Sequence, residues 1–217
     1  MCILIQRGEI VRISLSRFNR RLHTLYDWLY GMSVSLSALF AGGEVFVVDS
    51  MPLPVCKRVR AWRCRKVRGR AYCGYCAAKK ETFFGWRLHL ICTPDGLPVS
   101  FEMLPAAHQD LTAIHELSTI LPSGARLFGD KGFISAADAH SLLQETGVHL
   151  ITPKRKNMSP NSWADDYDLR QYRKRIETIY SQMEKMGIQH LYARTHLGFE
   201  MKVYASILAL AFTNLID

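Results

Sequence analysis

The sequence predicts a mixed α/β fold in which one mixed sheet of five strands is flanked by helices. Three observations carry this prediction. An apolar run comes first, a two-strand hairpin follows it, and helical and strand patterns then alternate to the end of the chain. With 217 residues and 48% hydrophobic content, the chain is long and apolar enough for one main domain with its own core.

The first predicted elements are a helix and a strand. Residues 14–30 carry leucine and phenylalanine at helical spacing, and the small residues of 33–44 predict a link. EVFVVDS (44–50) predicts a strand covered on both faces, because its apolar residues are continuous. Pro52 and Pro54 cannot donate to a ladder, so the strand is expected to end near Asp49.

The middle of the chain predicts a hairpin and a helix. GWRLHLIC (85–92) and LPVSFEML (97–104) are joined by TPDG, which has the composition of a tight turn. Asp110 is predicted to cap the next helix, which Pro122 stops. His89 is expected to be a structural histidine.

The last third alternates strands and helices. ARLFGD (125–130) predicts a short strand ending on a carboxylate, and VHLITP (148–153) predicts the fifth strand. Between them, Ser135 and Asp138 form a capping-box pattern. A long helix is expected from near Leu169, with a final apolar helix over roughly 201–215.

The positive charge is concentrated in one segment. The net charge is +9, and the segment from Lys57 to Lys80 has ten basic residues and no acidic one. We interpret residues 55–80 as a long basic loop that binds a polyanion, with a solvated face as the alternative. Trp62, Tyr72 and Tyr75 could stack on bases or pack internally. The ten are Lys57, Arg58, Arg60, Arg63, Arg65, Lys66, Arg68, Arg70, Lys79 and Lys80.

Membrane and disulfide classes are not favoured. No signal peptide is evident, and VYASILALAF is too short to span a bilayer, so a cytoplasmic protein without membrane contact is expected. Six cysteines are then expected to be reduced. Cys73 and Cys76 have the spacing of half a zinc knuckle, but no second close pair completes it, so zinc is not expected.

Three carboxylates are candidates for chemistry. Asp49 and Asp130 end predicted strands, and Glu177 lies at the flank of the apolar face of the long helix. Converging carboxylates repel one another unless a cation neutralises them, and Mg²⁺ prefers such oxygen ligands. Two ions can clamp the oxygens of an in-line phosphoryl transfer. For Asp49 alone, a turn or cap role is the alternative.

These blocks resemble a known family. VVDS, GDKGF and RKRIETIYSQMEKM, with KKETFFGWRLHLICTPDGLPVSFEMLPAAHQDL and NRRLHTLYDW, are similar to DDE transposases of insertion sequences, most closely the insertion sequence 982 family. The resemblance implies a ribonuclease H-like fold in which Asp49, Asp130 and Glu177 bind two Mg²⁺ ions, with Mn²⁺ as the substitute ion. It implies cleavage of transposon ends and strand transfer into target DNA, by a bacterial nucleoid-associated protein that acts as a homodimer.

The resemblance extends to further cations. Lys131, Arg173 and Arg175 lie beside the matched carboxylates and are additional candidates for DNA contact, with ordinary surface roles as the alternative. The family position for a lysine holds Glu184, with Lys185 beside it.

The N-terminal part departs from the family. Residues 1–43 are expected to be a short helical remnant of a DNA-binding region, and 44–217 the catalytic domain. Two alternatives follow: an inactive, N-terminally short copy that binds DNA without transposing, and a cysteine-rich nucleic-acid-binding module.

Overall fold

The computed structural model describes residues 2–6, 9–77 and 79–216. A six-stranded mixed sheet lies at its centre. β3 pairs antiparallel with β5 and parallel with β7, and β7 pairs parallel with β8. The other edge of β5 pairs antiparallel with β6 and β4. The strands are β3 (Val45–Lys57), β4 (Cys73–Cys76), β5 (Glu81–Cys92), β6 (Pro98–Pro105), β7 (Arg126–Gly129) and β8 (His149–Ile151).

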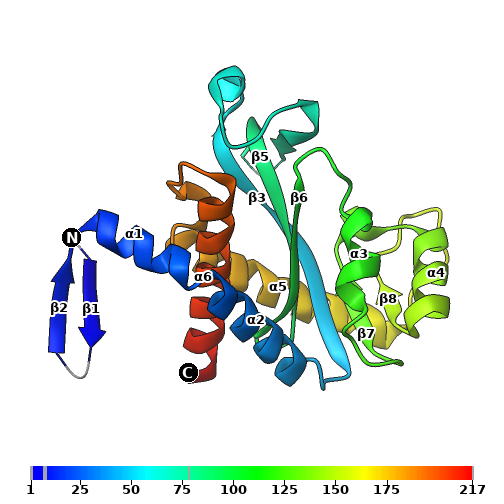
Figure 1. Cartoon of the computed structure of the whole chain (residues 1–217). Coiled ribbons are helices and arrows are strands. Elements are labelled where there is room, and N and C mark those ends of the chain that lie inside the picture. Colours follow the sequence, from blue (N-terminus) through cyan, green and yellow to red (C-terminus); the bar gives the residue numbers. More distant parts are fainter. Residues whose placement is uncertain (1, 7–8, 78, 217) are drawn as a thin grey trace.

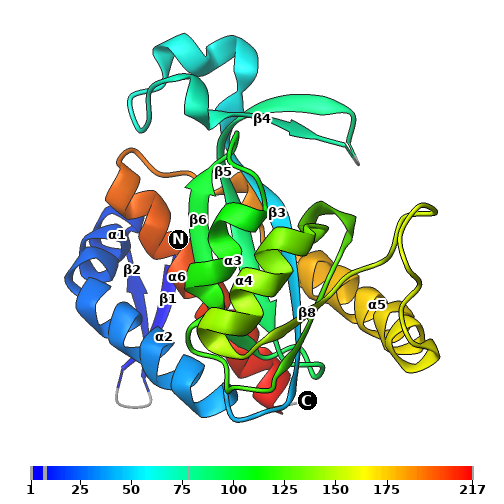
Figure 2. The same cartoon turned by 90° about the vertical axis from the view of Figure 1, so that its right-hand side faces the viewer.

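The predicted mixed α/β fold is therefore confirmed. The five expected strands are present in one sheet, and β4 from the basic segment is an additional sixth strand. Helices cover both faces of this sheet (Figures 1 and 2). They are α1 (Leu15–Thr24), α2 (Tyr26–Phe40), α3 (Leu111–Ser118), α4 (Ala136–Thr146), α5 (Trp163–Lys185) and α6 (His196–Ile216).

Alternation along β3 assigns its side chains to two cores. Phe46 and Val48 pack in the core that includes α3 and α4, whereas Met51 and Leu53 pack with residues of α5 and α6. Because side chains two residues apart share a face, Asp49 projects toward the α5 side of the sheet. The sheet thus fixes which helix meets this carboxylate.

The prediction that β3 ends near Asp49 was wrong. The ladder with β5 continues through Pro52 and Pro54, which lie opposite Arg87 and Gly85, and reaches Lys57. The parallel ladder with β7 stops at Val48, so β3 has only one partner beyond that point. Proline is tolerated there because one edge of the strand needs no amide donor.

The N-terminal segment also differs from the expectation. Residues 33–40 continue α2 instead of forming a link, because Phe40 and Leu36 pack into the core; Gly42 and Gly43 follow its end. Before α1, β1 (Cys2–Gln6) and β2 (Glu9–Ile13) form an antiparallel hairpin apart from the sheet (Figure 1).

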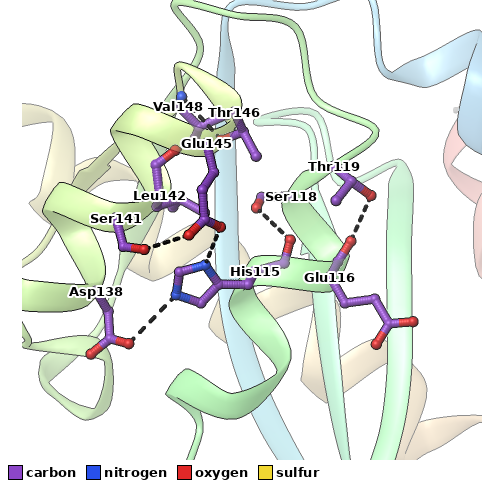
Figure 3. Close-up of polar contacts among 10 residues, drawn as sticks. All are labelled: His115, Glu116, Ser118, Thr119, Asp138, Ser141, Leu142, Glu145, Thr146 and Val148. Atoms are coloured by element: carbon purple, nitrogen blue, oxygen red, sulfur yellow. Dashed lines mark hydrogen bonds and ion pairs between the residues drawn. The ribbon is translucent and has the colours of Figure 1, made fainter.

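Caps define both ends of α4, and a histidine joins it to α3. The predicted capping box is present, since the Asp138 amide donates to Ser135 Oγ, and Gly147 ends the helix in the left-handed conformation. His115 of α3 contacts Asp138 at 3.5 Å and Glu145 at 3.1 Å (Figure 3). These contacts tie α3 to α4.

In the described part of the chain, no helix has both the length and the apolar character needed to cross a membrane.

Candidate active site

Asp49 lies where the ladder between β3 and β7 ends. The Ser50 amide donates to its Oδ1 at 2.7 Å. Burial, followed by the charges of Asp130 and Asp110, raises the pKa of Asp49 from 3.8 to about 7, against opposing effects of the Ser50 hydrogen bond and Arg173. This carboxyl therefore faces other acidic groups without full compensation.

Asp130 follows the end of β7, the strand beside β3. It caps the short 3-10 helix Lys131–Phe133, and its Oδ1 accepts from the Gly132 amide at 2.6 Å. A methyl group at Gly132 would lie 2.9 Å from this oxygen and 2.8 Å from Oδ2 of Asp110. The oxygens of Asp130 and Asp110 thus face one small space, which only glycine leaves open.

Asp110 is the site residue that the sequence did not predict. It occupies the N-cap position of α3, but its side chain makes no cap hydrogen bond. Its Oδ1 instead contacts His89 Nε2 at 3.1 Å and Arg87 Nη1 at 3.9 Å. Burial raises its pKa, but hydrogen bonds from His89 and Ser50 and the charge of Arg87 leave the pKa lowered, so Asp110 is held as a carboxylate. No periodicity or motif in the sequence marks this role.

Glu177 lies on α5 with its side chain turned to the surface. It pairs with Arg173 at 3.2 Å, and its side chain is 62% exposed. Arg173, one turn before Glu177, lowers the pKa of Asp49 through its charge. Tyr180, one turn after Glu177, has its pKa raised by the charge of Asp49. Since residues three and four apart share a helix face, Glu177 lies on the stripe of α5 that faces the site. The structure thus brings Asp49 and Asp130 together and leaves Glu177 on the adjoining stripe.

Tyr180 supplies a polar atom with no partner. Its hydroxyl is buried without a hydrogen bond among the described residues. Burial and the charges of Asp49, Cys92, Asp110 and Asp130, in that order, raise its pKa well above the usual value. It therefore remains a neutral phenol next to the carboxylates.

The donor set fits a hard divalent cation. Within residues 2–6, 9–77 and 79–216, no three His, Cys, Asp or Glu side chains are grouped closely enough to hold one ion as they stand. Mg²⁺, however, is usually bound by one or two carboxylates together with retained water. Asp49 and Asp130 provide two such groups, and their mutual repulsion is the feature that a cation would relieve.

The basic segment extends beyond the sheet from β3 to β5 (Figures 1 and 2). Of its ten cations, all but the half-buried Lys66 are exposed. Lys57 ends β3, and the 3-10 helices Arg58–Arg63 and Arg70–Tyr72 carry others. We call residues 57–80 the basic extension.

Aromatic side chains of the basic extension divide into two kinds. Trp62 is 77% and Tyr75 55% exposed, so both are accessible for stacking. Tyr72 packs against Phe84 and Trp86 and belongs to the core. Trp62 and Tyr75 therefore remain candidates for stacking on bases, whereas Tyr72 packs internally.

Lys79 ties the basic extension to the helical side of the sheet. Its Nζ lies 3.2 Å from Glu184 of α5 and 2.5 Å from Gln189 Oε1. Glu184, which stands at the family's lysine position, thus has a structural partner. Lys79 also borders a groove of about 920 Å³, whose cationic lining residues are Lys57, Lys66, Lys79, Arg194 and Lys202, with Glu81 as its carboxylate.

The remaining predicted cations are differently placed. Lys131 is exposed beside Asp130. Arg173 pairs with Glu177, and Arg175 donates to the carbonyl of Asp95 at 2.7 Å.

Cys56, just before the basic extension, packs together with cysteines inside it. Cys56 and Cys64 contact each other, and both lie with Cys73 against the core. They form no group of three metal-binding side chains within the described residues.

Comparisons with known proteins identify the family of the chain. The family model for the transposase DDE domain matches residues 41–196. Among curated proteins, none matches the chain. A solved structure, a crystal structure of a pre-cleavage Mos1 transpososome, aligns over 96% of this chain and 68% of its own, with 10% identity and a TM-score of 0.30. Because the matched segment is most of the chain and contains Asp49, Asp130 and Glu177, the chain belongs to the transposase DDE domain family.

Proposed function

We propose that the protein is the transposase of an insertion sequence related to the insertion sequence 982 family, and that it cleaves element ends and joins them to target DNA with Mg²⁺ or Mn²⁺. The observation that carries this proposal is the pair of carboxylates, Asp49 and Asp130, which directly follow the end of the parallel ladder between β3 and β7. Their charges oppose each other, as expected of a site that is complete only with a cation.

The chain's residues would have separate tasks. A bound divalent cation would lower the pKa of water and stabilise charge on the attacked phosphate. Asp49, within β3, and Asp130, directly after β7, would hold it from two adjacent strands. Glu177 is the third ligand that we assign, and it must exchange its exposed partner Arg173 for the cation.

The basic extension supports DNA as the substrate. Its exposed cations would neutralise phosphates, and the exposed rings of Tyr75 and Trp62, the latter with the Arg63 guanidinium 4.3 Å from its centroid, would stack on unpaired bases. Arg87 links this surface to the site, because it donates to the Tyr75 carbonyl and to Ser50 Oγ, each at 3.3 Å. DNA held by the basic extension would therefore lie next to the carboxylates.

The test uses a supercoiled plasmid that carries the encoding segment with its flanking DNA. With Mn²⁺, the purified chain is expected to nick or join this plasmid at the segment's boundaries, and Asp49→Asn to lose this activity. Asp95→Asn is the matched control, because Asp95 is exposed and its side chain lies outside the site. Equal cleavage by Asp49→Asn and the wild type would refute the assignment.

A second candidate is DNA binding without cleavage. The pairing of Glu177 with Arg173 favours it, since this carboxylate is turned to the surface. This candidate would be supported if the purified chain binds the same plasmid but leaves it intact with both Mg²⁺ and Mn²⁺.

A further inference from the structure

A buried histidine holds Asp110 in place. His89 lies in β5 and is 0% exposed, and its Nε2 contacts Asp110 Oδ1 at 3.1 Å. Ser50 lies directly across from His89 on β3, and Arg87 is two residues away on the same face of β5. His89 and Arg87 therefore both contact Oδ1 of Asp110, and the Ser50 hydroxyl is a further hydrogen-bond partner of this carboxylate, although Asp110 itself lies outside the sheet.

The other oxygen of Asp110 lies near the Asp130 carboxylate, beside Gly132. Oδ2 and the Asp130 oxygen would both lie under 3 Å from the methyl group of an alanine at Gly132. The charge of Asp110 also reaches Asp49, where it contributes to the raised pKa. Asp110 thus lies beside one proposed ligand, Asp130, and acts electrostatically on the other, Asp49.

The interior beyond His89 is polar as well. Glu102 lies directly opposite His89 on β6, and the Nδ1 of His89 and Oε2 of Glu102 are both buried without a hydrogen-bond partner among the described residues. A histidine that binds a carboxylate through one nitrogen is commonly oriented through the other. Glu102 is the group placed to do so here.

We propose that Asp110 is an additional acidic residue of the divalent-cation site and that His89 is its positioning residue. Oδ2 of Asp110 accepts hydrogen bonds from the water ligands of a cation held by Asp49 and Asp130. Contact through water agrees with the absence, among the described residues, of three side chains grouped tightly enough for direct binding. The inference rests on the proposed function and adds to it a residue outside the three assigned carboxylates.

Binding of Mn²⁺, followed by the electron paramagnetic resonance signal of the free ion, tests the role of Asp110 without DNA or turnover. Asp110→Asn is expected to weaken Mn²⁺ binding by about tenfold or more, as is typical when an outer-shell partner is removed. Asp95→Asn should bind as the wild type does. Unchanged affinity in Asp110→Asn overturns the inference, whereas unchanged affinity in Asp49→Asn overturns the proposed metal site itself.

A double-mutant cycle tests the positioning role. If His89 acts through Asp110, His89→Leu should weaken Mn²⁺ binding in the wild type but add little in the Asp110→Asn background. His89→Gln, which keeps a donor near the position of Nε2, should recover part of the affinity. Additive losses, or equal losses in the Gln and Leu variants with circular dichroism unchanged, would contradict positioning.

Discussion

Replacing Asp49 by asparagine should stabilise the metal-free protein at neutral and alkaline pH. Burial and the neighbouring charges raise the pKa of Asp49 from 3.8 to about 7. The folded state therefore binds more protons than the unfolded state between these two values, and stability falls as pH rises through this window. Each pKa unit corresponds to about 1.4 kcal/mol, so the ionised carboxyl costs roughly 4 kcal/mol above about pH 7.

Asparagine is neutral at every pH and does not pass through this transition. The stability of Asp49→Asn relative to the wild type should therefore increase with pH, and more than half of the roughly 4 kcal/mol should appear between about pH 5 and about pH 8. Urea denaturation in a chelating buffer at several pH values measures this difference in the free energy of unfolding, with Asp95→Asn as the control. Added Mn²⁺ should then stabilise the wild type and leave Asp49→Asn unchanged, because only the native site binds the ion.

If the free energies of unfolding of Asp49→Asn and of the wild type change in parallel with pH, the reasoning is refuted. Such parallel changes would mean that Asp49 is solvated well enough to ionise without cost, and that Asp130 and Asp110 do not act on it.

Three further results are expected. Ser135→Ala should lower the free energy of unfolding by about 1 kcal/mol in urea, because the first turn of α4 loses its cap; no loss would contradict the capping box. Gly132→Ala should weaken Mn²⁺ binding with an unchanged circular dichroism spectrum, since its methyl group would meet two carboxylate oxygens; wild-type affinity would mean that this space is not used. Replacing Arg60, Arg63 and Arg68 by alanine should reduce the salt dependence of DNA binding in filter assays by about 0.9 per lost phosphate contact, and an unchanged slope would remove the basic extension from the DNA interface.

The sequence predicted the parts of the fold that depend on local pattern. The hairpin of β5 and β6, the capping box at Ser135 and the strand before Asp130 all follow from apolar runs and turn residues, and the structure contains each of them. Asp49 and Asp130 could be paired from sequence because both follow predicted strands.

Other features depend on contacts between distant segments. Pro52 appeared to end β3, but the proline is tolerated because β7 has already stopped on that side. Asp110 appeared to be a helix cap, and only folding of the β5–β6 hairpin brings it to His89. Neither outcome is encoded in the few residues around the position, so local pattern could not have revealed it.

The continuation of β3 past Asp49 relates the site to the basic extension by length. Lys57 lies eight residues beyond Asp49 on the same strand. A strand rises about 3.3 Å per residue, almost the same as the 3.4 Å per base pair of one DNA strand. DNA running along this strand from the carboxylates would reach Lys57 roughly eight base pairs from the bond that we propose is cleaved, and phosphate-ethylation interference should then place the first contacts of the basic extension about that far from it.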